Sequence, residues 1–383
     1  MARRHSSDGE AELRKAPRRH GILCRLSMGL WGLCGLWLWR PPSEASVEEW
    51  YSRTLYRWIE GAVAPWAATL PFSAALALFA AGMLGFPLLW VGNWCYRRRV
   101  KKSAHWRGLW WGLKWGILTA PAVFLWFLVF WGAGYARVPI EERLGLDTGI
   151  ITEAEAADLR GQLLAVLQRD LPGDGGRDVA RAVAAVSKAL ELTIEAWDGK
   201  AISLPRTVKA TPHGLLLVNG TSGFCSPFTL EPHVDGALPD TAFVYTAAHE
   251  LAHIAGICGE AEADCASYTA GLNAVDPYAR YAVALRMYAA LAGTLADEQR
   301  KAAFGRLPKT ARQDLERAAQ AAKHYRIDWF SRLSWRAYDR YLRSQGVKEG
   351  VRDYGRGMRL FASLWRKGLA RFPGESGGPG AAS

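Results

Sequence analysis

The segment Thr246–Ser267 carries the residues with the clearest chemical potential. It reads TAAHELAHIAGICGEAEADCAS and contains an HExxH pattern formed by His249, Glu250 and His253. Residues four apart share one face of a helix, so the two imidazoles can converge on one metal ion. Glu250 follows the first histidine and can act as general base on a metal-activated water without binding the metal itself. The pattern predicts Zn2+ as the cofactor.

The flanking residues strengthen this interpretation. HExxH alone is a weak signal, because two histidines and a glutamate at this spacing also occur on surface helices. Here the neighbours are all uncharged, namely Thr246, Ala247, Leu251, Ala252, Ile254 and Ala255. A buried pair of histidines with a glutamate is costly unless something binds them. The segment therefore favours a buried metal site over a solvated helix face.

A catalytic zinc site also needs a third protein ligand and an open position for water. Gly256 can end the first helix with a positive φ angle, and a second helix is expected to follow it. Glu260 and Asp264 lie four apart on one face of that helix. The arrangement resembles that of gluzincins, where a glutamate of the second helix binds zinc and an acid one turn later supports a ligand histidine. The resemblance implies Glu260 as the third ligand and Asp264 as the residue that orients a histidine.

Other residues are weaker candidates for the site. Glu262 is the rival third ligand, but it points about 200° away from Glu260 around the same helix. Metzincins would place a histidine where this chain has Gly259. His233, in the segment GFCSPFTLEPHVD, could touch the metal or belong to an ordered loop beside it. An additional hydrogen bond to the substrate oxygen could come from one of three tyrosines, Tyr278, Tyr281 and Tyr354.

Three apolar spans precede the motif and predict transmembrane helices at about 21–39, 70–94 and 109–135. A basic start and a short apolar core would also fit a signal peptide in the first span. The following RPPSEAS is a poor cleavage site, which favours an uncleaved span.

Basic residues set the expected orientation and exclude one class of partner. The tail 1–20 and the loop 97–107 together supply nine of the twelve net positive charges, and both flank apolar spans. This distribution indicates cytoplasmic segments and no nucleic-acid partner. Everything after the third span is then expected to be extracytoplasmic.

The downstream domain, about 138–372, is expected to be mainly α with a small β element. Thr152 and Glu155 form a capping box for a helix reaching about Leu171, and a second helix is expected over Asp178–Trp197. Short strands are expected at Thr207–Ala210 and Leu215–Asn219, the latter a candidate edge strand for an extended peptide. The tail 373–383 has a disordered composition.

The whole chain resembles an uncharacterised bacterial family of predicted membrane-bound zincin-like peptidases, domain of unknown function 3810. The resemblance lies in EEWYSRTLYRWI, PFSAAL, WGAGYARVPI, GFCSPFTLE, AAHELAHIAGICGEAEADCAS and YDRYLRSQGVKEGVRDYGRG. Relatives usually have asparagine at the position of Asp264, and either side chain can accept a hydrogen bond from an imidazole. The resemblance implies transmembrane helices followed by a zincin-like, gluzincin-type metallopeptidase domain.

These observations predict a membrane-anchored zinc metallopeptidase that acts on a peptide or protein substrate outside the cytoplasm. Two alternatives stay open on the sequence alone. One is a non-catalytic zinc-bearing membrane sensor or scaffold, although such a site would not need Glu250 as a base. The other is a zinc hydrolase of a non-peptide amide, such as a cell-wall component.

Overall fold

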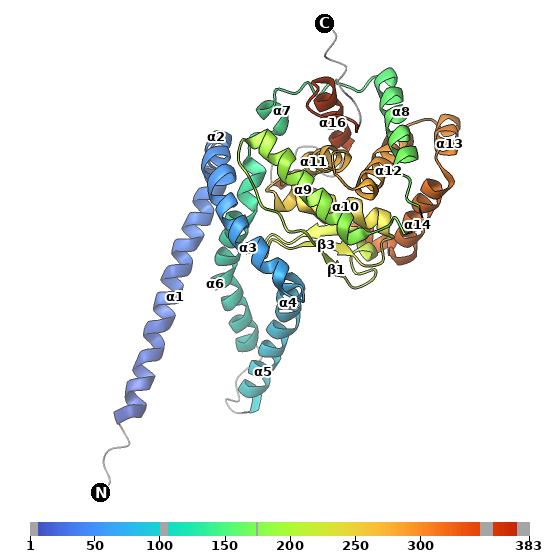
Figure 1. The fold of residues 1–383 in the computed structure, drawn as a ribbon. Coiled ribbons are helices and arrows are strands. Elements are labelled where there is room, and N and C mark those ends of the chain that lie inside the picture. The colour runs from blue at the N-terminus through green and yellow to red at the C-terminus, as the bar shows by residue number, and fades with distance from the viewer. Residues whose placement is uncertain (1–6, 100–105, 174, 345–354, 374–383) are drawn as a thin grey trace. The chain divides into compact units, whose positions relative to one another are not determined.

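The computed structural model describes residues 7–99, 106–173, 175–344 and 355–373. Over these residues the chain is mainly helical with one small three-stranded sheet, which confirms the expected class (Figure 1). The tails 1–6 and 374–383 and Tyr354 lie outside the described residues.

The chain divides into two compact units, and each is described by itself. The span unit consists of Met1–Ser43 and Leu76–Phe130, and the site unit consists of Glu44–Ala75 and Trp131–Ser383. The site unit therefore includes a segment from between the first two apolar spans.

The helices of the span unit are long and apolar enough to cross a membrane. They are α1 (Ser7–Trp39), α6 (Trp106–Phe130) and a run made of α4 (Ala74–Ala80), η2 (Ala81–Gly85) and α5 (Phe86–Arg99). Their candidate spans are Ile22–Trp39, Ala74–Tyr96 and Gly112–Phe130. Large apolar side chains such as Leu38 and Leu88 are 72% and 70% exposed, which suits a lipid environment better than water.

Two helix boundaries differ by four or five residues from the approximate limits expected for the spans. Leu70–Ser73 are not helical, because α3 (Tyr56–Thr69) ends there and Leu70, which precedes Pro71, is extended. A residue before proline is disfavoured in the α region, so the helix ends and a new one starts at Ala74. The third span ends at Phe130 and is followed by the short 3-10 helix η3 (Gly132–Ala136).

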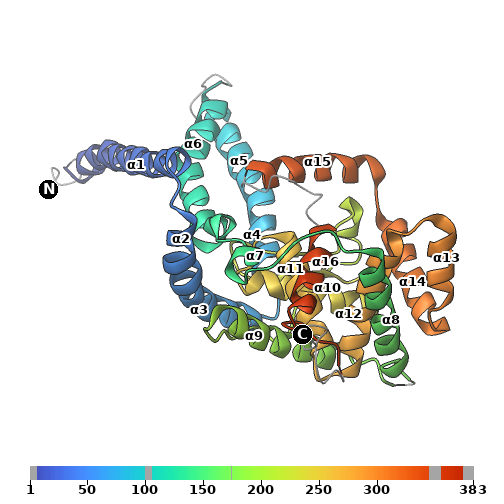
Figure 2. The same cartoon turned by 90° about the horizontal axis from the view of Figure 1, so that it is seen from above.

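The site unit is a stack of helices around a small sheet. α16 packs on α11, which packs on α9, α10 and α12, while α8 packs on α12 (Figure 2). Before the sheet come α2 (Glu44–Ser46), η1 (Val47–Leu55), α3, α7 (Ile140–Arg143), α8 (Glu153–Arg169) and α9 (Val179–Asp198). After the sheet come α10 (Asp240–Ile254), α11 (Glu260–Leu272), α12 (Pro277–Gly293), α13 (Asp297–Gly305), α14 (Lys309–Tyr325), α15 (Asp328–Ser344) and α16 (Arg356–Arg366).

Local sequence signals account for two of these helices. The capping box predicted at Thr152 is present, with the Thr152 side chain accepting from the Glu155 amide and the Glu155 side chain accepting from the Thr152 amide. α9 begins after Asp178, whose carboxylate accepts the amide of Arg181, and ends at Gly199 with φ +70°. Both signals act on the first and last turns, where backbone groups lack partners.

The sheet has three strands in the order β1-β3-β2. β3 (Pro232–Asp235) is central, parallel to β1 (Lys209–Thr211) and antiparallel to β2 (Gly223–Cys225). The first strand, expected at Thr207–Ala210, is found at Lys209–Thr211, and the sequence predicts neither β2 nor β3. Strands of three or four residues flanked by glycine and proline carry little periodic signal.

The strand expected at Leu215–Asn219 was wrong. This segment is a turn followed by the 3-10 helix η4 (Leu217–Asn219). The carboxylate of Asp235 accepts the amides of Gly214 and Leu216, both at 2.8 Å, and that of Leu217 at 3.1 Å. Three amides held by one carboxylate curl the backbone, so it cannot extend into a strand.

A buried ion-pair cluster joins distant parts of the site unit. Asp198, at the end of α9, contacts Arg57 of α3 at 2.6 Å, Arg137 at 2.9 Å and Arg143 at 2.5 Å. Arg137 also contacts Glu48 of η1 at 2.7 Å. The cluster fixes the segments on either side of the apolar spans to the helical stack.

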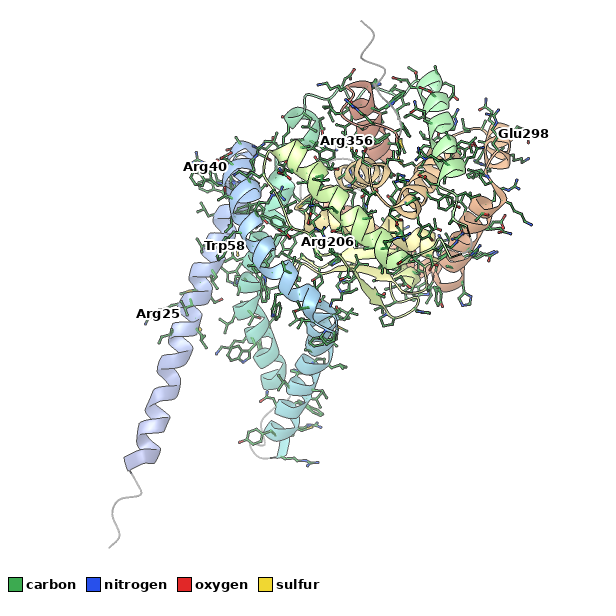
Figure 3. All side chains as sticks on the ribbon, in the orientation of Figure 1. Arg25, Arg40, Trp58, Arg206, Glu298 and Arg356 are labelled. Carbon is green, nitrogen blue, oxygen red and sulfur yellow. The ribbon has the colours of Figure 1, made fainter. Side chains whose placement is uncertain are left out.

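Exposed tryptophans mark the segment that leads toward the second span. Trp50, Trp58 and Trp66 of η1 and α3 are 73%, 76% and 60% exposed, and Trp58 projects outward from α3 (Figure 3). Tryptophan is enriched at membrane–water interfaces because indole is amphipathic.

Glu60 of α3 provides a test of the packing in this segment. It is buried, and its Oε1 has no hydrogen-bond partner among the described residues. Burial raises the pKa of Glu60 to about 8, against the opposing charge of Arg57. Between about pH 4.3 and about pH 8 the folded chain thus holds a proton that the unfolded chain releases, and stability falls as pH rises.

We therefore expect Glu60→Gln to flatten the loss of thermal stability between about pH 5 and about pH 8, since a neutral amide does not titrate. The measurement is the unfolding midpoint of the full chain in detergent across that range. Glu298→Gln, at an exposed position of α13 (Figure 3), is the control and should follow the wild type. Parallel curves for all three proteins would show that Glu60 does not carry the pH dependence.

Candidate metal centre

The metal centre is built on the turn between α10 and α11. α10 ends at Ile254, and Gly256 adopts φ +86°, which allows the chain to reverse toward α11. A Cβ at Gly256 would lie 2.8 Å from the ring of Tyr56. Tyr56 also donates to the carbonyl of Ile254 at 3.0 Å, so α3 fixes the end of the helix that carries the motif.

Three side chains converge as the sequence predicts. One ligand atom from each of His249, His253 and Glu260 lies within 4.8 Å of the others, and all three residues are buried. Oε2 of Glu260 lies 3.1 Å from Nε2 of His249 and 3.5 Å from Nε2 of His253. The two imidazoles come from one face of α10 and the carboxylate from the first turn of α11.

Each imidazole has a partner on its other nitrogen. Nδ1 of His249 lies 2.9 Å from Oδ1 of Asp264, which also accepts from the hydroxyl of Tyr245 at 2.6 Å. Nδ1 of His253 lies 2.7 Å from the carbonyl oxygen of Ile257. An imidazole that donates from Nδ1 presents the lone pair of Nε2, which is the arrangement that a metal ligand needs.

The electrostatics of the centre suit a cation. Burial alone would raise the pKa of the Glu260 carboxyl, but hydrogen bonds from His249 and His253 lower it well below its usual range. Burial likewise opposes the charged form of His249, and its contacts with Asp264 and Glu260 outweigh this and raise the pKa of the imidazole. The negative charge gathered here is the charge that a divalent ion would neutralise.

Glu250 differs from the other acids of the centre. It is buried, and its Oε2 has no hydrogen-bond partner among the described residues. Burial raises the pKa of Glu250 to about 7, although His253 and His249 oppose the shift. A Cβ at Gly223 of β2 would lie 2.6 Å from Oε1 of Glu250. The close approach of β2 thus requires glycine and holds Glu250 beside the sheet.

The weaker sequence candidates have other partners. Glu262 accepts the amide of Ile140 at 3.0 Å and lies 3.7 Å from Arg143. His233 stacks on Phe224, with ring centroids 4.4 Å apart, and its Nε2 lies 2.7 Å from the hydroxyl of Ser73.

The tyrosine candidates are likewise engaged elsewhere. Tyr281 donates to Asp314 at 2.9 Å, and the hydroxyl of Tyr278 lies 3.0 Å from that of Thr241. Asp314 in turn pairs with Arg177 at 2.9 Å. Neither of these two tyrosines has a hydrogen bond to a ligand residue in the part of the chain that is described, and Tyr354 lies outside that part.

Sequence reasoning missed three contributors to the centre. Tyr245 precedes His249 by one helical turn, so its spacing could have indicated a shared face. The carbonyl of Ile257 carries no side-chain signal at all. Tyr338 of α15, whose hydroxyl donates to Oε1 of Glu260, lies 78 residues from its partner. Its only sequence signal was membership of the segment YDRYLRSQGVKEGVRDYGRG.

The residues present fit a divalent transition metal. Two imidazoles and one carboxylate form the donor set of one type of catalytic zinc site, which leaves a fourth position open. The outer partners of both imidazoles are of the kind that accompanies metal-binding histidines. The structure therefore contains a possible metal-binding triad, and the donor set does not by itself choose among transition metals.

Comparison with known proteins identifies the family of this chain but assigns it no activity. The model of a family described as "Protein of unknown function (DUF3810)" matches residues 51–362. No curated protein and no solved structure matches the chain. The match covers most of the site unit and two of the three candidate spans.

Proposed function

Because this chain belongs to the DUF3810 family, whose description assigns no activity, we propose its function from the site: a membrane-anchored zinc metallopeptidase. The observation that carries the proposal is the buried triad of His249, His253 and Glu260 together with the carboxylate of Glu250, whose Oε2 has no hydrogen-bond partner among the described residues. A structural metal site needs ligands but no base, whereas a hydrolytic site needs both.

The proposed chemistry divides the work between the ion and the protein. A zinc ion held by the triad would lower the pKa of a bound water to ~7 and polarise a substrate carbonyl. Glu250 accepts the proton of the attacking water and delivers it to the leaving amine. Its raised pKa, caused by burial, places it near the range where a carboxyl can both take up and release a proton.

The sheet supplies a binding edge for a peptide. β2 is an outer strand of the sheet, and its Gly223 lies against Glu250. An extended substrate can add to such a strand through backbone hydrogen bonds, with side chains alternating between its two faces. We assign this role to β2 in place of the Leu215–Asn219 segment, which is not a strand.

We also propose that the site faces the extracytoplasmic side of a membrane. The candidate spans and the exposed tryptophans of η1 and α3 support anchoring, and the basic segments at 1–20 and 97–107 support the orientation. The expected substrates are peptides or protein segments at that surface.

Metal removal tests the proposal directly. The full chain, purified in detergent, should hold about one zinc and cleave members of a random peptide library, with products identified by mass spectrometry. Chelation should abolish cleavage, and added zinc should restore the same cut positions, because both the water and the carbonyl depend on the ion.

Two results would contradict this function. A fully zinc-loaded protein that cleaves no peptide would indicate a zinc-bearing sensor or scaffold. Cleavage of cell-wall amides in place of peptides would indicate a different hydrolase built on the same centre.

A further inference from the structure

The three candidate ligands are supported from three different parts of the fold. His249 is held by Asp264 of α11, and His253 by the carbonyl of Ile257 in the turn. Glu260 itself lies in the first turn of α11, but its side chain has a further support from outside these two elements. Its outer oxygen, Oε1, accepts a hydrogen bond from the hydroxyl of Tyr338, which comes from α15.

The two oxygens of Glu260 face different partners. Oε2 lies 3.1 Å from Nε2 of His249 and 3.5 Å from Nε2 of His253, so it is the oxygen directed at the triad. Oε1 is occupied by the Tyr338 hydroxyl. A carboxylate free to rotate could offer either oxygen or both, and a hydrogen bond on one oxygen fixes which oxygen is offered.

We infer that Tyr338 is a positioning residue for Glu260 and that α15 is therefore part of the metal centre. The inference rests on the proposed metal site but not on its catalytic activity. Tyr338 selects one orientation of the Glu260 carboxylate in the absence of the ion. Asp264 does the same for the imidazole of His249.

The packing contacts of α15 hold Tyr338 in a defined position. Figure 2 shows α15 continuing from α14, and the amide of Ile327, just before α15, donates to the carbonyl of Val218 at 2.9 Å. A Cβ at Gly220, which has φ +84°, would lie 2.9 Å from Oγ of Ser331 and 3.3 Å from Nε1 of Trp335. The ring of Trp335 lies 5.9 Å from that of Tyr338 at 79°.

This close packing has a consequence for coupling within the site unit. α15 is fixed against the turn that Asp235 organises, and that turn follows directly from the sheet. Tyr338 thus connects the orientation of Glu260 to the loop beside β1.

The test compares Tyr338→Phe with the wild type in the full chain, reconstituted in lipid nanodiscs. We expect zinc affinity, measured by competition with a chromophoric chelator, to fall by ~10–100-fold, as for other residues that support metal ligands. We also expect the visible absorption bands of the Co2+-loaded protein to change, because they report the number and arrangement of ligand atoms. Loss of the Tyr338 hydroxyl without a change at the metal would alter neither measurement.

Tyr288→Phe is the matched control. Tyr288 is buried in α12 of the same unit, and its hydroxyl donates to the carbonyl of Ala303 at 2.8 Å. This variant should lose some thermal stability and keep the zinc affinity and the Co2+ spectrum of the wild type. If Tyr338→Phe folds poorly, Trp335→Phe offers a second variant, which should move Tyr338 and shift the Co2+ spectrum in the same direction.

The possible results separate this inference from the proposed function. Unchanged affinity and spectrum in Tyr338→Phe would overturn the inference, even if the wild type cleaves peptides. A changed spectrum in a protein that cleaves no peptide would support the inference and count against the peptidase. A wild type that binds neither zinc nor Co2+ would overturn the metal centre and the inference with it.

Discussion

Glu250→Gln is expected to lower the turnover of peptide substrates by ~10²–10⁴-fold, the usual contribution of a general base. Zinc should stay bound at the wild-type level, because Glu250 is not one of the converging ligands. Glutamine has nearly the same size, so the contact with Gly223 is kept. The measurement is kcat on a cleaved library peptide, with metal content determined on the same samples.

Glu262→Gln is the matched control for this change. Glu262 is a partly buried glutamate close to the centre in sequence, but its carboxylate faces Ile140 and Arg143. The substitution should leave kcat and zinc content near the wild-type values. Full activity in Glu250→Gln, or loss of zinc in Glu262→Gln but not in Glu260→Ala, would show that base and ligand are misassigned.

His249→Ala and His253→Ala are expected to remove the metal. Each deletes a nitrogen that converges on the same point, so the loss of affinity should exceed the ~10–100-fold expected for Asp264→Ala, which only removes a supporting contact. Equilibrium dialysis against buffered zinc gives the affinities. His324→Ala, at an exposed position of α14, should bind zinc like the wild type.

The double variant gives the sharper outcome. With both imidazoles removed, only Glu260 remains of the triad, and one carboxylate does not make a zinc site. One equivalent of zinc retained by His249→Ala/His253→Ala would place the metal elsewhere. Such a result would remove the basis for both the peptidase and the role of Tyr338.

The core of the site could be predicted from sequence because its signals are local. His249, Glu250, His253, Glu260 and Asp264 all fall within sixteen residues, and helical geometry relates them. Gly256 was expected to end the first helix, and it does so with a positive φ angle. The capping box at Thr152 is also a local signal, since its two partners lie three residues apart in the sequence.

The remainder depends on contacts that no local pattern encodes. Tyr338 reaches Glu260 from 78 residues away, and Tyr56 reaches Ile254 from 198 residues away. The Leu215–Asn219 segment has an apolar composition typical of a strand, but the carboxylate of Asp235 reverses it into a turn. In each case a distant partner decides the structure, so propensity and periodicity could not predict it.

The site unit is formed by two separate stretches of chain, and this restricts both the order in which it can fold and the fragments that can retain its structure. Glu44–Ala75 is synthesised before the second and third spans, yet Tyr56 and Arg57 bond to carbonyls at the end of α10, at 3.0 Å and 3.3 Å. The second and third spans must therefore be synthesised before α10 can form its contacts with α3. Cleavage after Phe130 would give a fragment that lacks α3. In that fragment the turn at Gly256 would lose its contact with the ring of Tyr56. The site unit therefore depends on the segment Glu44–Ala75, and recombinant fragments beginning near residue 138 should be poor substitutes for the full chain.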